Sequence, residues 1–250
     1  MRKAVPFLLV AALALAVTGC GMAEKGKSQN EAAAQEPVKP ETRAFEEVQS
    51  TSEVSAEDTK SEPSEGSGVL VAYFSVSEDV DTSGVDTVAG ASIVVRDGEK
   101  LGNTEYVARL IRETVGGDLF RIETVEAYPL DHDPLVDQAA DEQDENARPQ
   151  LASHVEDFEQ YETVLLGYPN WWGDMPMPVY SFLEEYDFEG KTIIPFIIHG
   201  GSRASGTVGT ISKLEPGAQV LQDALVISRN DVADSEETVT AWAEGLGIKN

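Results

Sequence analysis

The amino-acid sequence predicts an α/β fold: a doubly wound, five-stranded parallel sheet covered by helices in a three-layer sandwich. Two observations support this prediction. From residue 68 onward, five apolar runs of strand length alternate with amphipathic stretches of helical spacing. The first run, VLVAYF at residues 69–74, has no charged position, as expected for a strand covered on both faces. Strands that alternate with helices and connect by right-handed crossovers form a parallel sheet.

The elements after the first strand follow the same two patterns. A helix is expected at residues 105–115, and the pair Gly116-Gly117 should end it. Further strands are expected at residues 119–124, 163–167, 192–198 and 220–227, and further helices at residues 134–146, 179–186 and 208–214. In the last helix Ser235 should be the N-cap, followed by acidic residues in the first turn. Its apolar face comprises Val239, Trp242, Ala243 and Leu246.

The N-terminus carries the pattern of an export signal. Arg2 and Lys3 precede an apolar run at residues 5–17 that is too short to span a bilayer, and Val-Thr-Gly-Cys follows. This ending resembles the bacterial lipobox, in which the cysteine is acylated and becomes the first residue of the mature chain. The resemblance implies that residues 1–20 are a lipoprotein signal peptide and that lipidated Cys20 anchors the protein to the extracytoplasmic face of the cell membrane. An ordinary secretory signal with an incidental cysteine is the alternative.

Residues 21–67 are rich in Glu, Ser, Ala, Lys and Pro and have few large apolar residues. Such a segment cannot bury enough apolar surface to offset its ordering entropy, so we predict a disordered acidic linker. A segment that folds on contact with a partner is the alternative. The folded domain is expected to span residues 68–250.

Charge and cysteine content exclude several kinds of function. The chain has 45 acidic and 18 basic residues and a formal net charge of −27. No nucleic-acid surface is expected, because phosphate backbones require clustered Lys and Arg, whereas a cationic partner is allowed. The single cysteine permits neither an intramolecular disulfide nor a cysteine-based zinc or iron–sulfur site, and we expect no metal.

Ligands of doubly wound sheets bind at the carboxyl ends of the strands. After the first strand come Ser75 and Ser77, a long insert, and then Gly102, Asn103 and Thr104 at a helix start. Hydroxyls and the free amides of a helix N-terminus can hold a phosphate. In so acidic a chain we expect these neutral donors, rather than Lys or Arg, to hold it. By itself, the tripeptide could equally be a turn with an N-cap.

The third strand is followed by a loop with two adjacent tryptophans. It contains Pro169, Asn170, Trp171, Trp172 and Gly173, with more prolines beyond. Adjacent indoles cannot both point into one core, so at least one should face the loop surface or a flat aromatic ligand. The prolines and glycine favour a preset loop. The alternative is that both indoles have only a packing role.

The fourth strand is followed by His199, Gly200, Gly201 and Ser202. The glycines would let backbone amides approach a ligand closely. A single histidine at a strand end is more often structural than an acid or base, so we interpret His199 as a neighbour of a ligand's ring edge.

At these three loops the chain resembles the flavodoxin family, especially a branch with Gly-Tyr-Pro-x-Trp-Trp-Gly-x-Met-Pro-Met-Pro and Phe-x-x-His-Gly-Gly-Ser. The likeness extends over residues 68–247. It implies an FMN cofactor whose ring lies between the loops at residues 169–173 and 199–202. The residues implied for its phosphate are Ser75, Ser77, Gly102, Asn103 and Thr104.

The insert at residues 78–101 departs from the family pattern, which is usually a compact Ser-x-Thr-Gly-Asn-Thr. Here the insert separates the two halves of that motif. Ile93-Val94-Val95 followed by Asp97-Gly98 predicts a hairpin. Either it forms a lid over the phosphate end or it alters the site.

The resemblance implies an electron carrier. Because acidic surroundings and aromatic walls disfavour a negatively charged reduced ring, we expect a low potential. The sequence indicates no acid–base pair, nucleophile or metal ligands beside the site, and we interpret Asp131, His132 and Asp133 as a solvated loop. The redox partner protein is not identified. Alternatives are an FMN-dependent NAD(P)H reductase for quinone, azo or nitro acceptors, or a non-redox binding module that has lost FMN.

Overall fold

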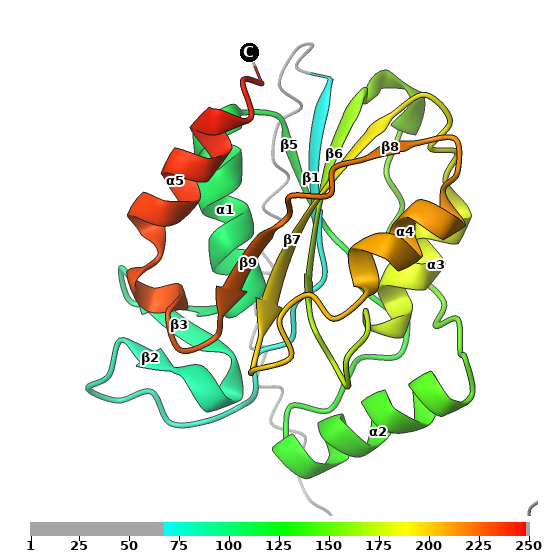
Figure 1. Ribbon diagram of the computed structural model, residues 1–250. Coiled ribbons are helices and arrows are strands. Elements are labelled where there is room, and N and C mark those ends of the chain that lie inside the picture. Colours follow the sequence, from blue (N-terminus) through cyan, green and yellow to red (C-terminus); the bar gives the residue numbers. More distant parts are fainter. Residues whose placement is uncertain (1–67, 249–250) are drawn as a thin grey trace, which may run out of the picture. The chain divides into compact units, whose positions relative to one another are not determined.

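A parallel sheet with helices on both faces organises residues 68–248, which are the residues described by the computed structural model (Figure 1). The predicted signal peptide, Cys20 and the predicted linker lie outside the described residues, as do the last two residues. Among the described helices, none has the length and apolar character needed to cross a membrane.

The main sheet has the strand order of a doubly wound fold. In spatial order its strands are β5 (Asp118–Arg121), β1 (Val69–Tyr73), β6 (Thr163–Pro169) and β7 (Thr192–His199), with β8 (Gln219–Val220) and β9 (Leu225–Ser228) both beside β7. All of these pairs are parallel. From β1 the chain first adds β5 on one side and then β6 on the other, so the winding direction reverses between β1 and β6. That position is the topological switch point. The predicted fold class is confirmed.

The fifth strand is where the sheet differs most from the prediction; the second strand, predicted at residues 119–124, also ends early, at Arg121. Instead of one strand at residues 220–227, β8 pairs with the start of β7 and β9 pairs with its end. Between them, the Gln222 side chain donates a 3.0 Å hydrogen bond to the Val220 carbonyl. The Gln222 side chain thus takes the place of a backbone donor at the Val220 carbonyl. The polar pair Gln222-Asp223 also interrupts the apolar run, so the strand beside β7 is broken at these residues.

Helices cover the two faces of the sheet (Figure 1). On one face lie α1 (Asn103–Val115) and α5 (Glu236–Gly245); on the other lie α3 (Met177–Glu185) and α4 (Thr207–Leu214). Each face has its own buried apolar cluster. Short 3₁₀ turns occur at Ala89–Ala91, Phe158–Gln160 and Val232–Asp234.

The predicted ends of α1 and α5 are largely confirmed. Gly116 caps α1 with φ 73°, and Gly117 follows with φ 87°. A Cβ at Gly117 would lie 2.4 Å from the Val69 carbonyl oxygen, so only glycine fits. Ser235 occupies the N-cap position of α5, but its hydroxyl donates to the Val232 carbonyl at 2.8 Å and makes no cap bond. The N-cap position predicted for Ser235 is therefore confirmed, although its side chain does not cap the helix.

Helix α2 (His132–Asp144) lies across the carboxyl edge of the sheet instead of covering a face (Figure 1). Only Leu135 and Ala139 of this helix are buried, so it has too narrow an apolar face to cover a strand layer. It begins two residues before the predicted start. Asp131 is its N-cap and His132 and Asp133 open its first turn, which corrects the interpretation of these three residues as a loop.

The insert forms a small antiparallel sheet of its own. Its strands are β2 (Thr87–Val88), β3 (Ile93–Arg96) and β4 (Glu99–Gly102). The predicted hairpin is confirmed: Asp97 (φ 53°) and Gly98 (φ 82°) form the two-residue turn between β3 and β4. Strand β4 runs directly into α1, so the end of the insert lies next to the end of β1, where the insert began.

Candidate functional site

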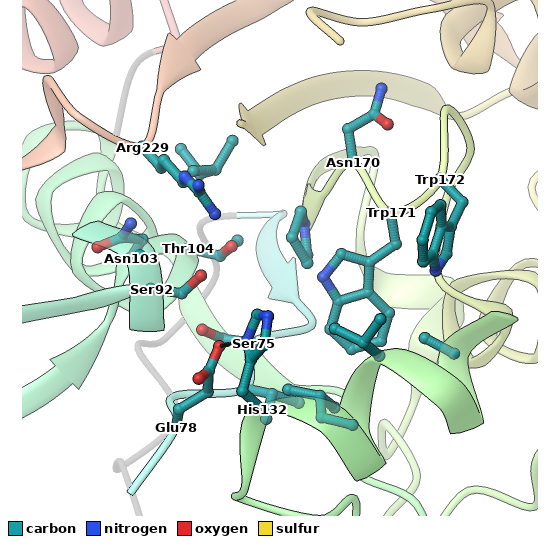
Figure 2. A pocket seen from close by; sticks show the side chains of 17 residues that line it. Ser75, Glu78, Ser92, Asn103, Thr104, His132, Asn170, Trp171, Trp172 and Arg229 are labelled. Carbon is teal, nitrogen blue, oxygen red and sulfur yellow. Dashed lines mark hydrogen bonds and ion pairs between the residues drawn. The ribbon is translucent and has the colours of Figure 1, made fainter. Parts of the chain in front are cut away.

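A pocket of about 180 Å³ opens at the carboxyl edge of the main sheet, beside the topological switch point. Figure 2 shows Ser92, Thr104 and Arg229 on one side of it and both indoles of the tryptophan pair on the other. Seven residues predicted from the sequence line it: Ser75, Asn103, Thr104, Pro169, Asn170, Trp171 and Trp172. Segments from three distant parts of the chain therefore meet at one rim.

The start of α1 forms the first wall. Ser75, at the end of β1, is 5% exposed, and Asn103 and Thr104 are 1% and 2% exposed. Gly102 is the N-cap and makes no side-chain cap bond. A Cβ on Gly102 would lie 2.2 Å from the Ser75 hydroxyl oxygen, so glycine allows the end of β1 to approach the helix start. The two halves of the interrupted motif are thus reunited in space.

Asn103 is an unusual residue in this wall. Its side-chain Oδ1 and Nδ2 are buried, and neither has a hydrogen-bond partner among the described residues. Its backbone N–H donates to the Ser92 carbonyl at 2.8 Å, which ties the helix start to the insert. Leaving a buried amide group unpaired costs about 1–3 kcal/mol. Native proteins tolerate this rarely, and most often where a ligand or water supplies the missing partner.

The tryptophan loop forms the second wall, and its backbone is fixed by a tight turn. Trp171 and Asp174 exchange backbone hydrogen bonds of 3.0 and 2.9 Å. The two residues between them, Trp172 (φ 53°) and Gly173 (φ 85°), both have positive φ, as in a type I′ turn. The carboxylate of Asp174 accepts a 2.9 Å hydrogen bond from the Tyr180 hydroxyl on α3. These hydrogen bonds fix the conformation of the loop, as its proline and glycine content predicts.

The two indoles have different surroundings. Trp171 is partly buried and makes edge contacts with Phe74 and Tyr128, with ring centroids 5.4 and 5.7 Å apart. Trp172 is 62% exposed. The prediction that at least one indole faces away from the core is confirmed.

Asn170 joins this loop to the one that follows β7. Its Oδ1 accepts the Gly173 N–H at 3.0 Å, while its Nδ2 donates to the Arg203 carbonyl at 2.8 Å and to the Ser205 hydroxyl at 3.0 Å. Asn170 is buried, at 9% exposed. The side chain therefore couples the positions of two loops that are distant in sequence.

The loop after β7 is not part of the pocket wall. His199, Gly200, Gly201 and Ser202 do not line the pocket. The Gly201 N–H donates to Nδ1 of His199 at 2.9 Å, and burial lowers the pKa of this histidine. Nδ1 of His199 therefore accepts a hydrogen bond within its own loop.

Three other predicted residues also lie outside the pocket wall. Gly102 and Gly173 shape the backbone next to it, and Ser77 lines an adjoining hollow of about 420 Å³ that shares Ser75 and Val76 with the pocket. Lys100 and Arg121 line that hollow as well. Both cations are paired with carboxylates, at 3.2 Å to Asp79 and 3.4 Å to Glu123 respectively.

Sequence reasoning missed four polar residues of the pocket: Glu78, Ser92, His132 and Arg229. Nδ1 of His132 lies 3.0 Å from the Glu78 carboxylate, and this hydrogen bond raises the pKa of His132. The expectation that no acid–base pair lies beside the site is therefore wrong. The pocket also contains a cation, contrary to the expectation of uncharged donors alone.

Only one of these four residues had a usable sequence signal. Arg229 directly follows the last strand, so the carboxyl-end rule that identified the other loops applies to it as well. Glu78 and His132 are 54 positions apart, and no sequence pattern connects them. Among the described residues, no group of three or more His, Cys, Asp or Glu side chains is arranged to hold a metal ion.

Strand order and pocket position define a doubly wound α/β protein with a pocket at the switch point of the sheet, the place where such folds bind ligands. The chain belongs to the flavodoxin family: the family model described as flavodoxin matches residues 92–246. No curated protein matches the chain.

Several solved structures resemble the chain. A Bacteroides eggerthii DSM 20697 protein described as a flavoprotein has 25% sequence identity and a TM-score of 0.50, covering 72% of this chain and 98% of its own. A similarly described protein of Bacteroides uniformis ATCC 8492 has 28% identity and a TM-score of 0.48, covering 70% and 97%. A Lactobacillus acidophilus NCFM flavoprotein, solved in complex with FMN, has 17% identity and a TM-score of 0.46, covering 68% and 97%.

Proposed function

We propose that this protein is an FMN-binding electron carrier, tethered through lipidated Cys20 to the extracytoplasmic face of the cell membrane. One observation carries the FMN proposal. The pocket combines a helix start lined by the hydroxyl side chains of Ser75 and Thr104 with an aromatic loop, at the switch point of a flavodoxin-family sheet. These are the two chemical surfaces that a phosphate attached to a planar ring requires.

The residues of the pocket fit the two parts of FMN. Ser75 and Thr104 offer hydroxyls, and the dipole of α1 favours a negative group at its start. Trp171 and Trp172 offer flat apolar surfaces on the opposite side. When bound, FMN supplies the electron-transfer chemistry, and the protein sets its position and potential.

The size of the pocket favours a carrier. Pockets that enclose a small-molecule ligand usually measure about 300–1,000 Å³. At about 180 Å³ this pocket would enclose FMN only in part. A partly exposed cofactor suits exchange of electrons with a second protein. The net charge of −27 also disfavours a negatively charged reduced ring, so we propose a low potential and a partner with a cationic surface.

A reductase is the second candidate, because the Glu78–His132 pair lies in the pocket wall. The raised pKa of His132 favours an imidazolium that could donate a proton to an acceptor. Kinetics separate the two functions. A reductase oxidises NAD(P)H with a quinone and no second protein, and His132→Gln should slow it. A carrier shows no such turnover.

Titration of the purified full chain with FMN, followed by quenching of flavin fluorescence, tests the cofactor. Thr104→Val keeps the side-chain shape but removes the hydroxyl, so we expect about fivefold to tenfold weaker FMN binding, the loss of about one hydrogen bond. Thr210→Val on α4, outside the pocket, is the matched control and should not change the affinity. Protein that stays colourless and ignores added FMN would instead support a non-redox binding module.

Membrane tethering has a separate test. The wild-type chain should incorporate a labelled fatty acid and sediment with membranes in a bacterial host. Cys20→Ser should abolish both the label and the sedimentation. Equal sedimentation without label in both proteins would rule out a lipid anchor on Cys20.

A further inference from the structure

We infer that Arg229 is the cation that pairs with the ligand's phosphate, so that the pocket selects FMN over riboflavin by charge. This inference rests on the proposed FMN binding and deepens it. It also differs from the sequence-based expectation that only neutral groups would hold the phosphate.

The backbone fixes Arg229 at the carboxyl edge of the sheet. Arg229 directly follows β9, which pairs in parallel with the end of β7. Its N–H donates a 2.8 Å hydrogen bond to the His199 carbonyl, which continues the ladder beyond the strand. Figure 2 shows the guanidinium directed into the pocket on the side of Thr104.

The absence of a side chain at Gly200 leaves room for the Arg229 guanidinium. A Cβ added at Gly200 would lie 3.3 Å from Nε and 3.4 Å from Cζ of Arg229. The side chain therefore passes closely over the glycine on its way to the pocket. This contact explains a glycine in the loop after β7 although that loop does not line the pocket itself.

The Arg229 side chain has no hydrogen bond or ion pair among the described residues, although the chain has 45 acidic residues. By contrast, Arg109 binds Glu99 at 2.8 Å and Arg148 binds Glu184 at 2.7 Å. A guanidinium presents five N–H donors in a planar fork and is always charged. Left unpaired in a pocket wall, it is suited to an anion that enters from outside.

The other charged groups of the pocket leave this cation available. The Glu78 carboxylate is hydrogen bonded to His132 at 3.0 Å, so its charge is directed toward the imidazole. On the side of Arg229 lie the Ser92 and Thr104 hydroxyls. A phosphomonoester has oxygens enough to accept from all of these donors, and a guanidinium binds two of them at once. Riboflavin has the same ring but no such group.

Affinities of FMN and riboflavin, measured by fluorescence titration of the full chain, test the role of Arg229. We expect Arg229→Gln to weaken FMN binding about tenfold to a hundredfold and to leave riboflavin binding unchanged. Arg229→Lys should retain part of the preference, because it keeps the charge and loses the fork. Gly200→Ala should lower the FMN preference without removing any charge, because it displaces the guanidinium.

Arg203→Gln is the matched control: it removes the same charge from an exposed position outside the pocket and should leave the ratio of affinities unchanged. The affinity of the wild type for FMN should also fall more steeply with salt than that of Arg229→Gln. If Arg229→Gln weakens both flavins equally, or neither, Arg229 does not pair with the phosphate although FMN binding stands. If the wild type binds neither flavin, the proposed function fails and this inference fails with it.

Discussion

At the scale of single residues, Trp172 has the most unusual conformation in the site. A bulky residue with φ 53° is an outlier. Because Trp172 is 62% exposed, its indole gains little from apolar burial that could offset the backbone strain. Such strain is found mainly where a function requires the residue. The neighbouring hydrogen bonds of Asn170 and Asp174 hold the turn in place. The exposed indole gives no packing reason for this conformation, and the proposed role at the pocket would supply a reason for it.

Trp172→Gly should separate the strain from this role. Glycine accepts positive φ without cost, so we expect thermal unfolding at the same temperature as the wild type or slightly higher. FMN affinity should fall about twofold to tenfold, because one aromatic contact contributes about 0.5–1.5 kcal/mol. Calorimetry and flavin titration on the same samples check both halves. A variant that is less stable but binds FMN normally would show that the indole has only a structural role.

The Glu78–His132 pair predicts a pH effect with a definite sign. The hydrogen bond to Glu78 raises the pKa of His132 above its ordinary value of 6.5. The pair therefore contributes fully to stability below pH 6.5, and its contribution is lost as the pH rises through the raised pKa. In an NMR titration, Glu78→Gln should bring the pKa of His132 down toward 6.5, while Glu185→Gln, beside His154, should not affect it. An unchanged pKa in Glu78→Gln would show that the pair does not form in solution.

At the scale of elements, close packing between β6 and β7 constrains Gly167. A Cβ at this position would lie 2.1 Å from the ring of Phe196, which is fully buried. Gly167→Ala should therefore destabilise the protein by about 1–3 kcal/mol in a denaturant titration. The control is Gly209→Ala in α4, where nothing lies within 4 Å, and where helix propensity predicts a gain of about 0.5–1 kcal/mol. Equal effects of the two substitutions would contradict this account of the packing.

Apolar patterning predicted which elements exist better than it predicted their positions. Strands β1, β6 and β7 are buried along nearly their whole length, so their continuous apolar runs identified them. The break between β8 and β9 depends on side-chain bonds of Gln222 that no hydropathy pattern encodes. Hydrophobic periodicity shows which face of a helix is buried, but it does not show which element that face packs against. The position of α2 at the sheet edge was therefore not predicted.

Prediction of the site from the sequence was limited in the same way, because it could not foresee tertiary packing. The residues of the site that were predicted lie directly after strand ends, where topology alone brings loops together. Glu78 and Ser92 belong to the insert, and His132 begins α2; these reach the pocket through tertiary packing. Charge was misjudged for the same reason, since the total of −27 does not reveal that one arginine remains unpaired inside a pocket.

At the scale of the whole molecule, the insert and α2 turn an open sheet edge into a walled pocket. The insert contributes Gly90, in the 3₁₀ turn at Ala89–Ala91, and Ser92, which follows that turn. Helix α2 contributes Leu135, Val136 and Ala139. Because β4 continues directly into α1, the insert also sets the position of the helix start. The separation of the two halves of the phosphate motif is therefore compatible with one site.

The charge of the whole molecule determines how the proposed carrier should meet its partners. With a formal net charge of −27, long-range attraction should accelerate encounters with basic proteins and weaken as salt screens it, since the Debye length falls from about 30 Å at 0.01 M to about 10 Å at 0.1 M. Reduction of a basic c-type cytochrome by the chemically reduced, FMN-loaded chain should therefore slow steeply with added salt in stopped-flow measurements. An uncharged quinone is the control acceptor, and its rate should hardly change. A cytochrome rate that is independent of salt would mean that the charge lies away from the face where electrons leave, and that the chain recognises its partner by shape rather than by charge.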